Sequence, residues 1–294
     1  MKIINFEQNG VKLYGVVVGD KVLTSTQLKE VLGFKFPESV MDFFSQEALI
    51  NNVRNFIDKK LFSKKMLDEA ISYLKVKVLP PVPLPPKIVC LGLNYKDHAE
   101  EQGVKPPTEP VIFFKPRTSI TGPFDEIFYP SIVTKLDYEG ELAIVIGRSG
   151  KDIAISNSMD HVLGYTVFND VSARDIQFKD GQWSRGKSFD TFAPIGPWIV
   201  TKEQIRPHNL TIVTRVNGEI RQNSSTSNMI IKIPEVIVSL SKVMTLEPGD
   251  LIATGTPSGV GIFMKPEPRL LKPDDVVEIT IVGIGTIRNR VVKI

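Results

Sequence analysis

The chain has 294 residues, of which 42% are hydrophobic and 23% are charged, and its 36 basic and 33 acidic residues leave a net charge of +3. This composition is typical of a globular protein with a large core, and without a basic cluster it does not indicate a nucleic-acid partner. No apolar segment is long enough to span a bilayer and the first residues lack a signal-peptide core. We therefore expect a cytoplasmic protein without a membrane partner.

The first 75 residues are predicted to form a small α+β domain. Strands are expected over residues 2–6 and 11–18, because β-branched and aromatic residues there are bounded by turn residues at 9–10 and 19–20. From Thr26 the apolar period changes, and we predict helices over residues 39–44, 49–57 and 64–74. This region contains no concentration of chemically reactive groups.

A proline-rich segment follows. Five of the eight residues from 79 to 86 are proline, which suits neither a helix nor a central strand. We predict an extended linker over residues 76–86 and a second, larger domain over residues 87–294. A ligand for a proline-recognition domain is a weaker alternative, because bulky apolar residues flank the segment.

Strands dominate the predicted second domain. They are expected over residues 87–91, 111–115, 142–146, 162–168, 198–201, 210–216, 251–254, 276–282 and 286–292. Helices are expected only over residues 95–102, 170–179 and 233–241. Many strands with few intervening helices indicate an α+β chain that is mainly β, rather than a doubly wound parallel sheet. The single cysteine, Cys90, lies in an apolar run and is expected to be a buried, inert thiol.

Residues 137–147 (DYEGELAIVIG) join three carboxylates to an apolar strand. Glu139 and Glu141 are two positions apart, so both would project from the same face of an extended strand. Like charges side by side repel each other unless a cation lies between them, and a divalent metal with oxygen ligands would supply that cation. The alternative is an exposed acidic strand entrance. Nothing in the pattern separates Asp137 from a surface residue.

Asp170 is the third candidate ligand, because it follows the strand expected at residues 162–168. Two Glu and one Asp are a typical oxygen set for Mg²⁺ or Mn²⁺, and Ca²⁺ is an option if further oxygens contribute. The three histidines and one cysteine form no cluster, which argues against structural zinc. The alternative role for Asp170 is the N-cap of the helix expected over residues 170–179.

Three further features could serve a metal-dependent reaction. Lys187 lies between glycine and aromatic residues, where it could contact an anionic substrate or be a solvated loop lysine. The glycine-rich loop at residues 255–261 could bring backbone N–H groups and the Thr256 hydroxyl to an anion, but it lacks the ending of a nucleotide P-loop. His98 and Glu101 are three positions apart on an expected helix, so they could form a general-base pair or an ordinary surface pair.

Six segments, in this order, resemble the fumarylacetoacetate hydrolase family and together span about residues 87–290. They are LGLNYKDH (91–98), FFKP (113–116), DYEGELAIVIG (137–147), GYTVFNDVSARD (164–175), GKSFD (186–190) and GDLIATGTPSGVG (249–261). Six ordered matches are far more specific than any one of them. The first 75 residues resemble the variable first domain of longer family members more weakly.

The resemblance implies a mixed β-roll catalytic domain in a homodimer, with a divalent metal bound by Glu139, Glu141 and Asp170. It also implies that Lys187 contacts a bound 2-oxo acid, and that Gln177 and Thr256 help to hold the carboxylate of this small-molecule substrate. His98 with Glu101 would form a dyad on a mobile lid and activate water.

The leading hypothesis is a Mg²⁺- or Mn²⁺-dependent hydrolase that cleaves a carbon–carbon bond of acylpyruvates, related 2-oxo acids or 1,3-diketones through a metal-stabilised enolate. The nearest alternative is a decarboxylase, isomerase or hydratase of dicarboxylic 2-oxo acids on the same metal site. A non-catalytic, metal-stabilised binding protein is the alternative from a different functional class.

Overall fold

The structure is a computed structural model and describes residues 1–294. Its largest sheet has 12 strands, in the order β4-β3-β2-β1-β14-β12-β11-β17-β6-β7, with β5 paired to β1 and β8 paired to β14. Their bounds are β1 (Lys2–Gln8), β2 (Val11–Val18), β3 (Lys21–Thr24), β4 (Ile71–Ser72), β5 (Lys77–Val78), β6 (Ile88–Gly92), β7 (Val111–Lys115), β8 (Ile120–Thr121), β11 (Gly140–Ile146), β12 (Val162–Asn169), β14 (Ala193–Thr201) and β17 (Leu251–Ala253).

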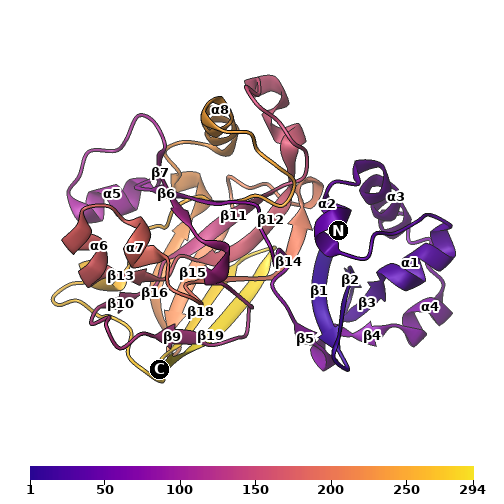
Figure 1. Cartoon of the computed structure of the whole chain (residues 1–294), viewed down its shortest axis with the longest axis horizontal. Coiled ribbons are helices and arrows are strands. Elements are labelled where there is room, and N and C mark those ends of the chain that lie inside the picture. Colours follow the sequence, from indigo (N-terminus) through magenta and orange to yellow (C-terminus); the bar gives the residue numbers. More distant parts are fainter.

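A second sheet has five strands in the order β16-β15-β18-β19-β9, and β10 and β13 form a separate two-stranded pair. The bounds are β9 (Ile127–Tyr129), β10 (Leu136–Asp137), β13 (Ser172–Ala173), β15 (Thr211–Val216), β16 (Glu219–Ser225), β18 (Val276–Ile281) and β19 (Gly285–Lys293). The predicted α+β class with predominant strands is confirmed (Figure 1).

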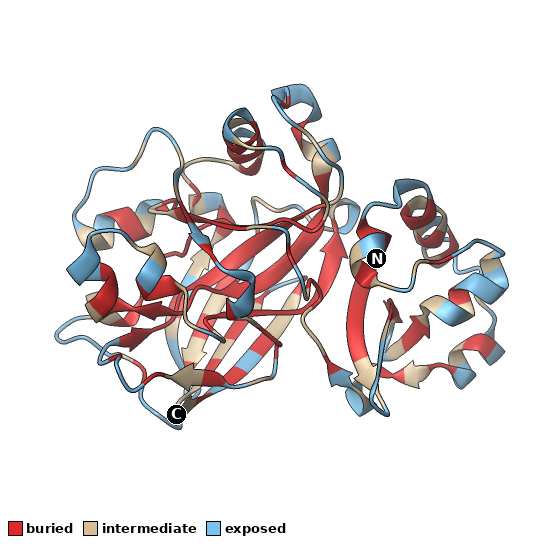
Figure 2. Cartoon of the chain, viewed as in Figure 1, coloured by how far each residue is buried: buried red, intermediate tan, exposed pale blue.

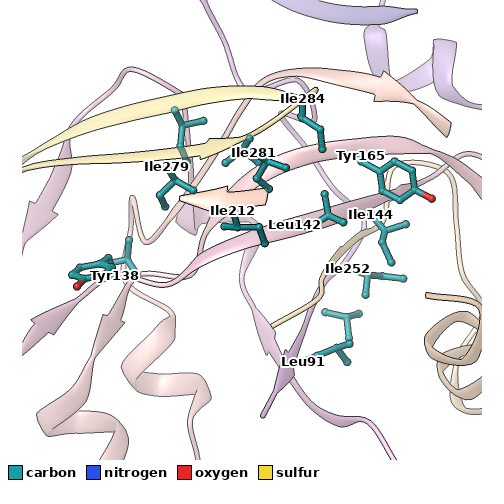
Figure 3. Close-up of a cluster of buried hydrophobic side chains, with 14 of the residues drawn as sticks. Leu91, Tyr138, Leu142, Ile144, Tyr165, Ile212, Ile252, Ile279, Ile281 and Ile284 are labelled. Atoms are coloured by element: carbon teal, nitrogen blue, oxygen red, sulfur yellow. The ribbon is translucent and has the colours of Figure 1, made fainter. Parts of the chain in front are cut away.

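The main core lies between the two sheets. Leu142 and Ile144 of β11 belong to one apolar cluster with Ile212 and Ile279 of the second sheet (Figure 3). The intervening residues of β11, such as Ala143, belong to a second cluster on the opposite face. A strand that is buried on both faces needs apolar side chains at successive positions. This requirement explains why residues 142–146 of β11 are all apolar. Figure 2 shows the central strands buried and the helices with exposed outer faces.

The strands expected at residues 2–6 and 11–18 are confirmed as β1 and β2, and the three helices expected in this region are present. The helices here are α1 (Ser25–Leu32), α2 (Val40–Phe44), α3 (Glu47–Asp58) and α4 (Lys64–Glu69). The helix predicted over residues 64–74 is too long, because Ala70 is extended and Ile71 pairs with Val22 of β3. Strand pairing across the fold has overridden local helix propensity there.

The N-terminal region shares the large sheet with the rest of the chain. Strand β1 pairs antiparallel with β14, with Ile3 opposite Ile199, and the predicted linker contributes β5 to the same β1. In Figure 1 this region lies at the right, in indigo, beside β14. The hydrogen-bonded ladder is therefore continuous across the predicted boundary, and the division at residues 76–86 stays a prediction.

Four helices belong to the larger region: α5 (Lys96–Gln102), α6 (Arg174–Asp180), α7 (Ser184–Lys187) and α8 (Ile233–Val243). The helices expected at residues 95–102 and 233–241 are confirmed as α5 and α8.

Strand β16 was not predicted, because its sequence, EIRQNSS, is polar. Asn217 and Gly218, both with positive φ, form the hairpin turn before it, and such an Asn-Gly pair is the sequence signal that could have revealed the strand. None of the helices combines the length and the hydrophobicity that a membrane-spanning helix requires.

Candidate functional site

Three candidate metal ligands converge at one end of β11 and β12. Glu139 directly precedes β11, Glu141 is the second residue of β11, and Asp170 directly follows β12. Since the two strands are antiparallel, the start of one lies beside the end of the other. One oxygen atom from each of the three carboxylates lies within 4.8 Å of the other two.

The surroundings of these carboxylates exclude their alternative roles. Glu139 and Glu141 are only 7% and 1% exposed, so the alternative prediction, an acidic strand entrance with both side chains in water, is wrong. Asp170 is not a helix N-cap, because α6 begins at Arg174 and its N-cap is Ala173. The carboxylate of Asp170 instead accepts hydrogen bonds from two buried lysines.

Lys187 and Lys115 are those lysines. The Nζ of Lys187 donates to Glu139 Oε2 at 2.9 Å and to Asp170 Oδ2 at 2.7 Å, and the Nζ of Lys115 donates to Asp170 Oδ1 at 2.6 Å. Lys187 is 2% exposed, so the solvated-loop alternative is wrong. The sequence analysis assigned no role to Lys115, although this residue lies in the segment FFKP. The sequence signal that could have identified it is a lysine at the end of an apolar strand.

Gly186 allows Lys187 to reach this position. A Cβ atom at residue 186 would lie 2.8 Å from the backbone nitrogen of Gln177 and 2.9 Å from the carbonyl oxygen of Ala173. Real Cβ atoms do not approach backbone atoms this closely. Helix α7 can therefore pack directly on α6, and this packing places Lys187 over the carboxylates.

Arg174 and Asp137 complete the buried charge cluster, and the sequence assigned a role to neither. Arg174 donates through Nε to Asp137 Oδ2 at 2.9 Å, and its Nη1 lies 2.7 Å from Glu139 Oε1. Asp137 is fully buried and also accepts the backbone N–H groups of Gly261 and Ile262, at 2.8 and 3.0 Å. Asp137 is thus a structural anchor between β10 and the loop after β17, and not a surface residue.

With all seven of its side chains ionised, this cluster carries one net negative charge. Four buried carboxylates face three buried cations, namely Asp137, Glu139, Glu141 and Asp170 against Lys115, Arg174 and Lys187. Burial opposes the ionisation of Glu139, but Lys187 and Arg174 outweigh it and lower the pKa of Glu139 to about 2. Burial, together with the charges of Asp170 and Glu139, raises the pKa of Glu141. The oxygen donors and the unmatched negative charge fit a divalent cation held by Glu139, Glu141 and Asp170.

A cavity of about 60 Å³ opens beside the cluster. The polar part of its wall includes the three residues expected to contact substrate, and the apolar part is largely aromatic. The polar wall residues are His98, Gln102, Glu139, Arg174, Gln177, Lys187 and Thr256. The other wall residues are Leu91, Gly92, Leu93, Phe113, Phe178, Trp183 and Phe263. An apolar wall with few convergent polar groups is typical of a small-molecule site.

Gln177 and Thr256 are both fixed in the cavity wall. Gln177 Oε1 accepts from Arg174 Nη1 at 3.1 Å. The Thr256 hydroxyl donates to the Gly140 carbonyl at 3.0 Å and accepts from Gln222 at 2.8 Å. Their predicted roles in holding a substrate carboxylate stay predictions.

His98 and Glu101 form a pair at the cavity. His98 Nδ1 lies 3.0 Å from Glu101 Oε2, and Glu101 Oε1 accepts the backbone N–H of Gly259 at 2.9 Å. His98 is 5% exposed, so an ordinary surface pair is wrong. His98 lines the cavity together with Lys187 and Thr256, and the catalytic role of the His98–Glu101 pair stays a prediction.

The chain is similar to known proteins over most of its length. The family model described as fumarylacetoacetate (FAA) hydrolase C-terminal matches residues 87–292. The chain is 41% identical over 304 residues to oxaloacetate tautomerase YisK of Bacillus subtilis (strain 168), covering 99% of this chain and 100% of that protein.

Two solved structures are similar over the whole chain. Fumarylacetoacetate hydrolase from Exiguobacterium antarcticum is 39% identical, with a TM-score of 0.84 and 100% of both chains covered. Maleylpyruvate hydrolase from Sphingobium sp. SYK-6, in complex with manganese(II) and pyruvate, is 30% identical, with a TM-score of 0.79 and 100% and 99% of the two chains covered.

Proposed function

The chain belongs to the fumarylacetoacetate hydrolase family, and from this premise we propose that it is a divalent-metal-dependent enzyme that interconverts the enol and keto forms of a small dicarboxylic 2-oxo acid. A relative that matches the whole chain is named oxaloacetate tautomerase, which supports this reaction over the others that the same site could serve. Oxaloacetate is therefore the first substrate to test.

The observation that carries the proposal is the buried charge cluster beside a small cavity. A divalent metal held by Glu139, Glu141 and Asp170 would act as a Lewis acid towards the carboxylate and oxo group of the substrate. The chain itself places the Lys187 ammonium and the Arg174 guanidinium at the same edge of the cavity. These fixed positive charges stabilise an enolate oxygen as its negative charge develops, and they need no reorganisation to do so.

The rest of the cavity favours a compact, anionic substrate. The volume of about 60 Å³ is small, and Phe113, Trp183 and Phe263 supply much of the apolar wall. Enol–keto conversion moves one proton between an oxygen and the neighbouring carbon and consumes no water. A small cavity whose wall carries Lys187 and Arg174 therefore suits this reaction.

Metal removal tests the proposal directly. Treatment with EDTA is expected to abolish catalysed enol–keto conversion of oxaloacetate, because the cluster then lacks its fourth cation, and Mg²⁺ or Mn²⁺ should restore it. The conversion is followed by the ultraviolet absorbance of the enol, with metal alone in buffer as the control for the uncatalysed rate. If fully demetallated protein keeps the full catalysed rate, the proposal fails.

Hydrolysis of acylpyruvates is a second candidate, and the buried His98–Glu101 pair favours it, as does the similarity to a maleylpyruvate hydrolase. In hydrolysis the pair would take a proton from the attacking water.

Replacing His98 by Ala is expected to lower hydrolysis by about 10²- to 10⁴-fold, the usual contribution of a general base. Metal-dependent enolisation should remain in part, because the charge cluster is unaltered. Product formation from an acylpyruvate is measured beside the oxaloacetate assay. His161→Ala is the matched control, since His161 lies against the Arg148 carbonyl and outside the cavity wall. Equal losses of hydrolysis and enolisation in H98A would contradict the assignment of water activation to His98 and of enolisation to the charge cluster.

Three further properties belong to the same proposal. We expect Mg²⁺ or Mn²⁺ as the resident metal, and the similarity to a manganese complex supports the second. We also propose a homodimer and a cytoplasmic location, as the family resemblance and the composition suggest.

A further inference from the structure

Both ring nitrogens of His98 are engaged by side chains of its own helix, α5. Nδ1 lies 3.0 Å from Glu101 Oε2, and Nε2 lies 2.7 Å from Gln102 Nε2. A carboxylate only accepts hydrogen bonds, so Nδ1 carries the proton. In the neutral ring Nε2 is then an acceptor, and the Gln102 amide donates to it.

The ring of His98 is held in this orientation from several sides. Glu101 Oε1 accepts the backbone N–H of Gly259 at 2.9 Å, and Asp97 Oδ2 accepts the Ser224 hydroxyl at 2.6 Å. These two contacts bind α5 to the loop after β17 and to β16. The Phe263 ring also packs edge-on against His98, with ring centroids 6.2 Å apart. Gln102 is half-buried, and its contact with His98 is the one hydrogen bond of its side chain.

We propose that Gln102 sets the reaction specificity of this site, by occupying the lone pair of His98 Nε2 and so suppressing water activation. The inference rests on the proposed function, because it explains why a chain that carries a hydrolase-like pair would act as a tautomerase. Gln102 is a positioning residue in this role, since it acts through His98.

The two reactions differ in their need for that lone pair. In hydrolysis the water oxygen bonds to the distal carbonyl carbon, and a water proton passes to Nε2. The carbon–carbon bond breaks, its electron pair goes to the carbon of the leaving enolate, and that carbon takes the proton back. The Gln102 amide occupies the position where this water would have to bind. Tautomerisation uses no water, so we expect this contact to lower its rate less than that of hydrolysis.

Substitution of Gln102 by Met tests the inference, because Met has a similar length and no N–H donor. The ratio of acylpyruvate hydrolysis to oxaloacetate tautomerisation is expected to rise by about two- to tenfold, as follows from the net worth of one hydrogen bond. Glu100→Met is the matched control, since Glu100 lies on the exposed side of the same helix. An unchanged ratio, or an equal rise in E100M, would overturn the inference.

A second measurement does not depend on turnover. Nitrogen-15 NMR of the wild-type protein reports the tautomer of each ring, and the chain has only three histidines. The H98A spectrum identifies the signals of His98. The expected result is an unprotonated, hydrogen-bonded Nε2 whose signal shifts in Q102M. A proton on Nε2 in the wild-type protein at neutral pH would overturn the inference.

These results also separate the inference from the proposed function. If the metal-loaded wild-type protein converts no oxaloacetate, the proposed function fails, and the NMR result still decides the tautomer of His98. If tautomerisation persists in every variant and the ratio does not move, the proposed function stands and the role of Gln102 fails.

Discussion

Replacing Glu141 by Gln is expected to lower the affinity for Mg²⁺ or Mn²⁺ by about 100-fold or more and to leave the fold intact. Loss of an outer-shell partner already costs about 10- to 100-fold in metal affinity, and Glu141 is proposed as a direct ligand. The amide oxygen of Gln can still accept the Gly255 N–H that Glu141 accepts at 2.8 Å. The substitution also removes a buried negative charge beside Glu139 and Asp170, so the metal-free protein should be at least as stable as the wild type.

Titration calorimetry with Mn²⁺ and thermal unfolding with and without metal measure the two effects. In the wild type, added metal should raise the unfolding temperature, because it binds the folded state. In E141Q the metal-free unfolding temperature should be unchanged or higher, and the rise with metal should be lost. Glu100→Gln, on the exposed side of α5, is the matched control. Wild-type metal affinity in E141Q would exclude Glu141 from the ligand set.

Replacing Asp137 by Ala is expected to lower the free energy of unfolding by about 3–5 kcal/mol, the usual cost of removing one partner of a buried ion pair. The change would remove the carboxylate that Arg174 contacts through Nε, and it would leave the backbone N–H groups of Gly261 and Ile262 without their acceptor. Because Arg174 also contacts Glu139, the metal site should be disturbed along with the fold.

Urea unfolding of the wild type, D137A, R174M and the double variant measures this cost. The two single changes should be clearly non-additive, because both residues belong to one buried network. Asp68→Ala, at an exposed position of α4, should change stability by no more than about 0.5 kcal/mol. A loss of that small size in D137A would show that the buried pair does not hold the loop after β17 in place.

The sequence alone predicted elements whose local pattern is strong. The apolar run of β11 and the β-branched and aromatic residues of β1 and β2 lie where strands were expected, because strand propensity and burial agree there. Prediction failed where a partner strand decided the outcome. Ile71 is extended because it pairs with Val22, and the polar strand β16 exists because it pairs with β15. The pairing of Ile71 is not visible in a local window of sequence, and the only local signal of β16 was the Asn217-Gly218 turn before it.

The same division holds for the site. The residue types and spacing of Glu139, Glu141 and Asp170 made a metal site one option beside exposed carboxylates and a helix N-cap. The family resemblance then favoured the metal site. Only the tertiary structure revealed Lys115, which reaches Asp170 from 55 residues away, and Arg174, which reaches Asp137 from 37 residues away.

The engagement of His98 by Gln102 was likewise not assigned from the sequence, although both residues lie on one short helix. A sequence determines which charges and donors each element carries. Whether a buried charge is neutralised, and by which partner, depends on the distance between elements, and that distance is set only when the sheets and helices pack.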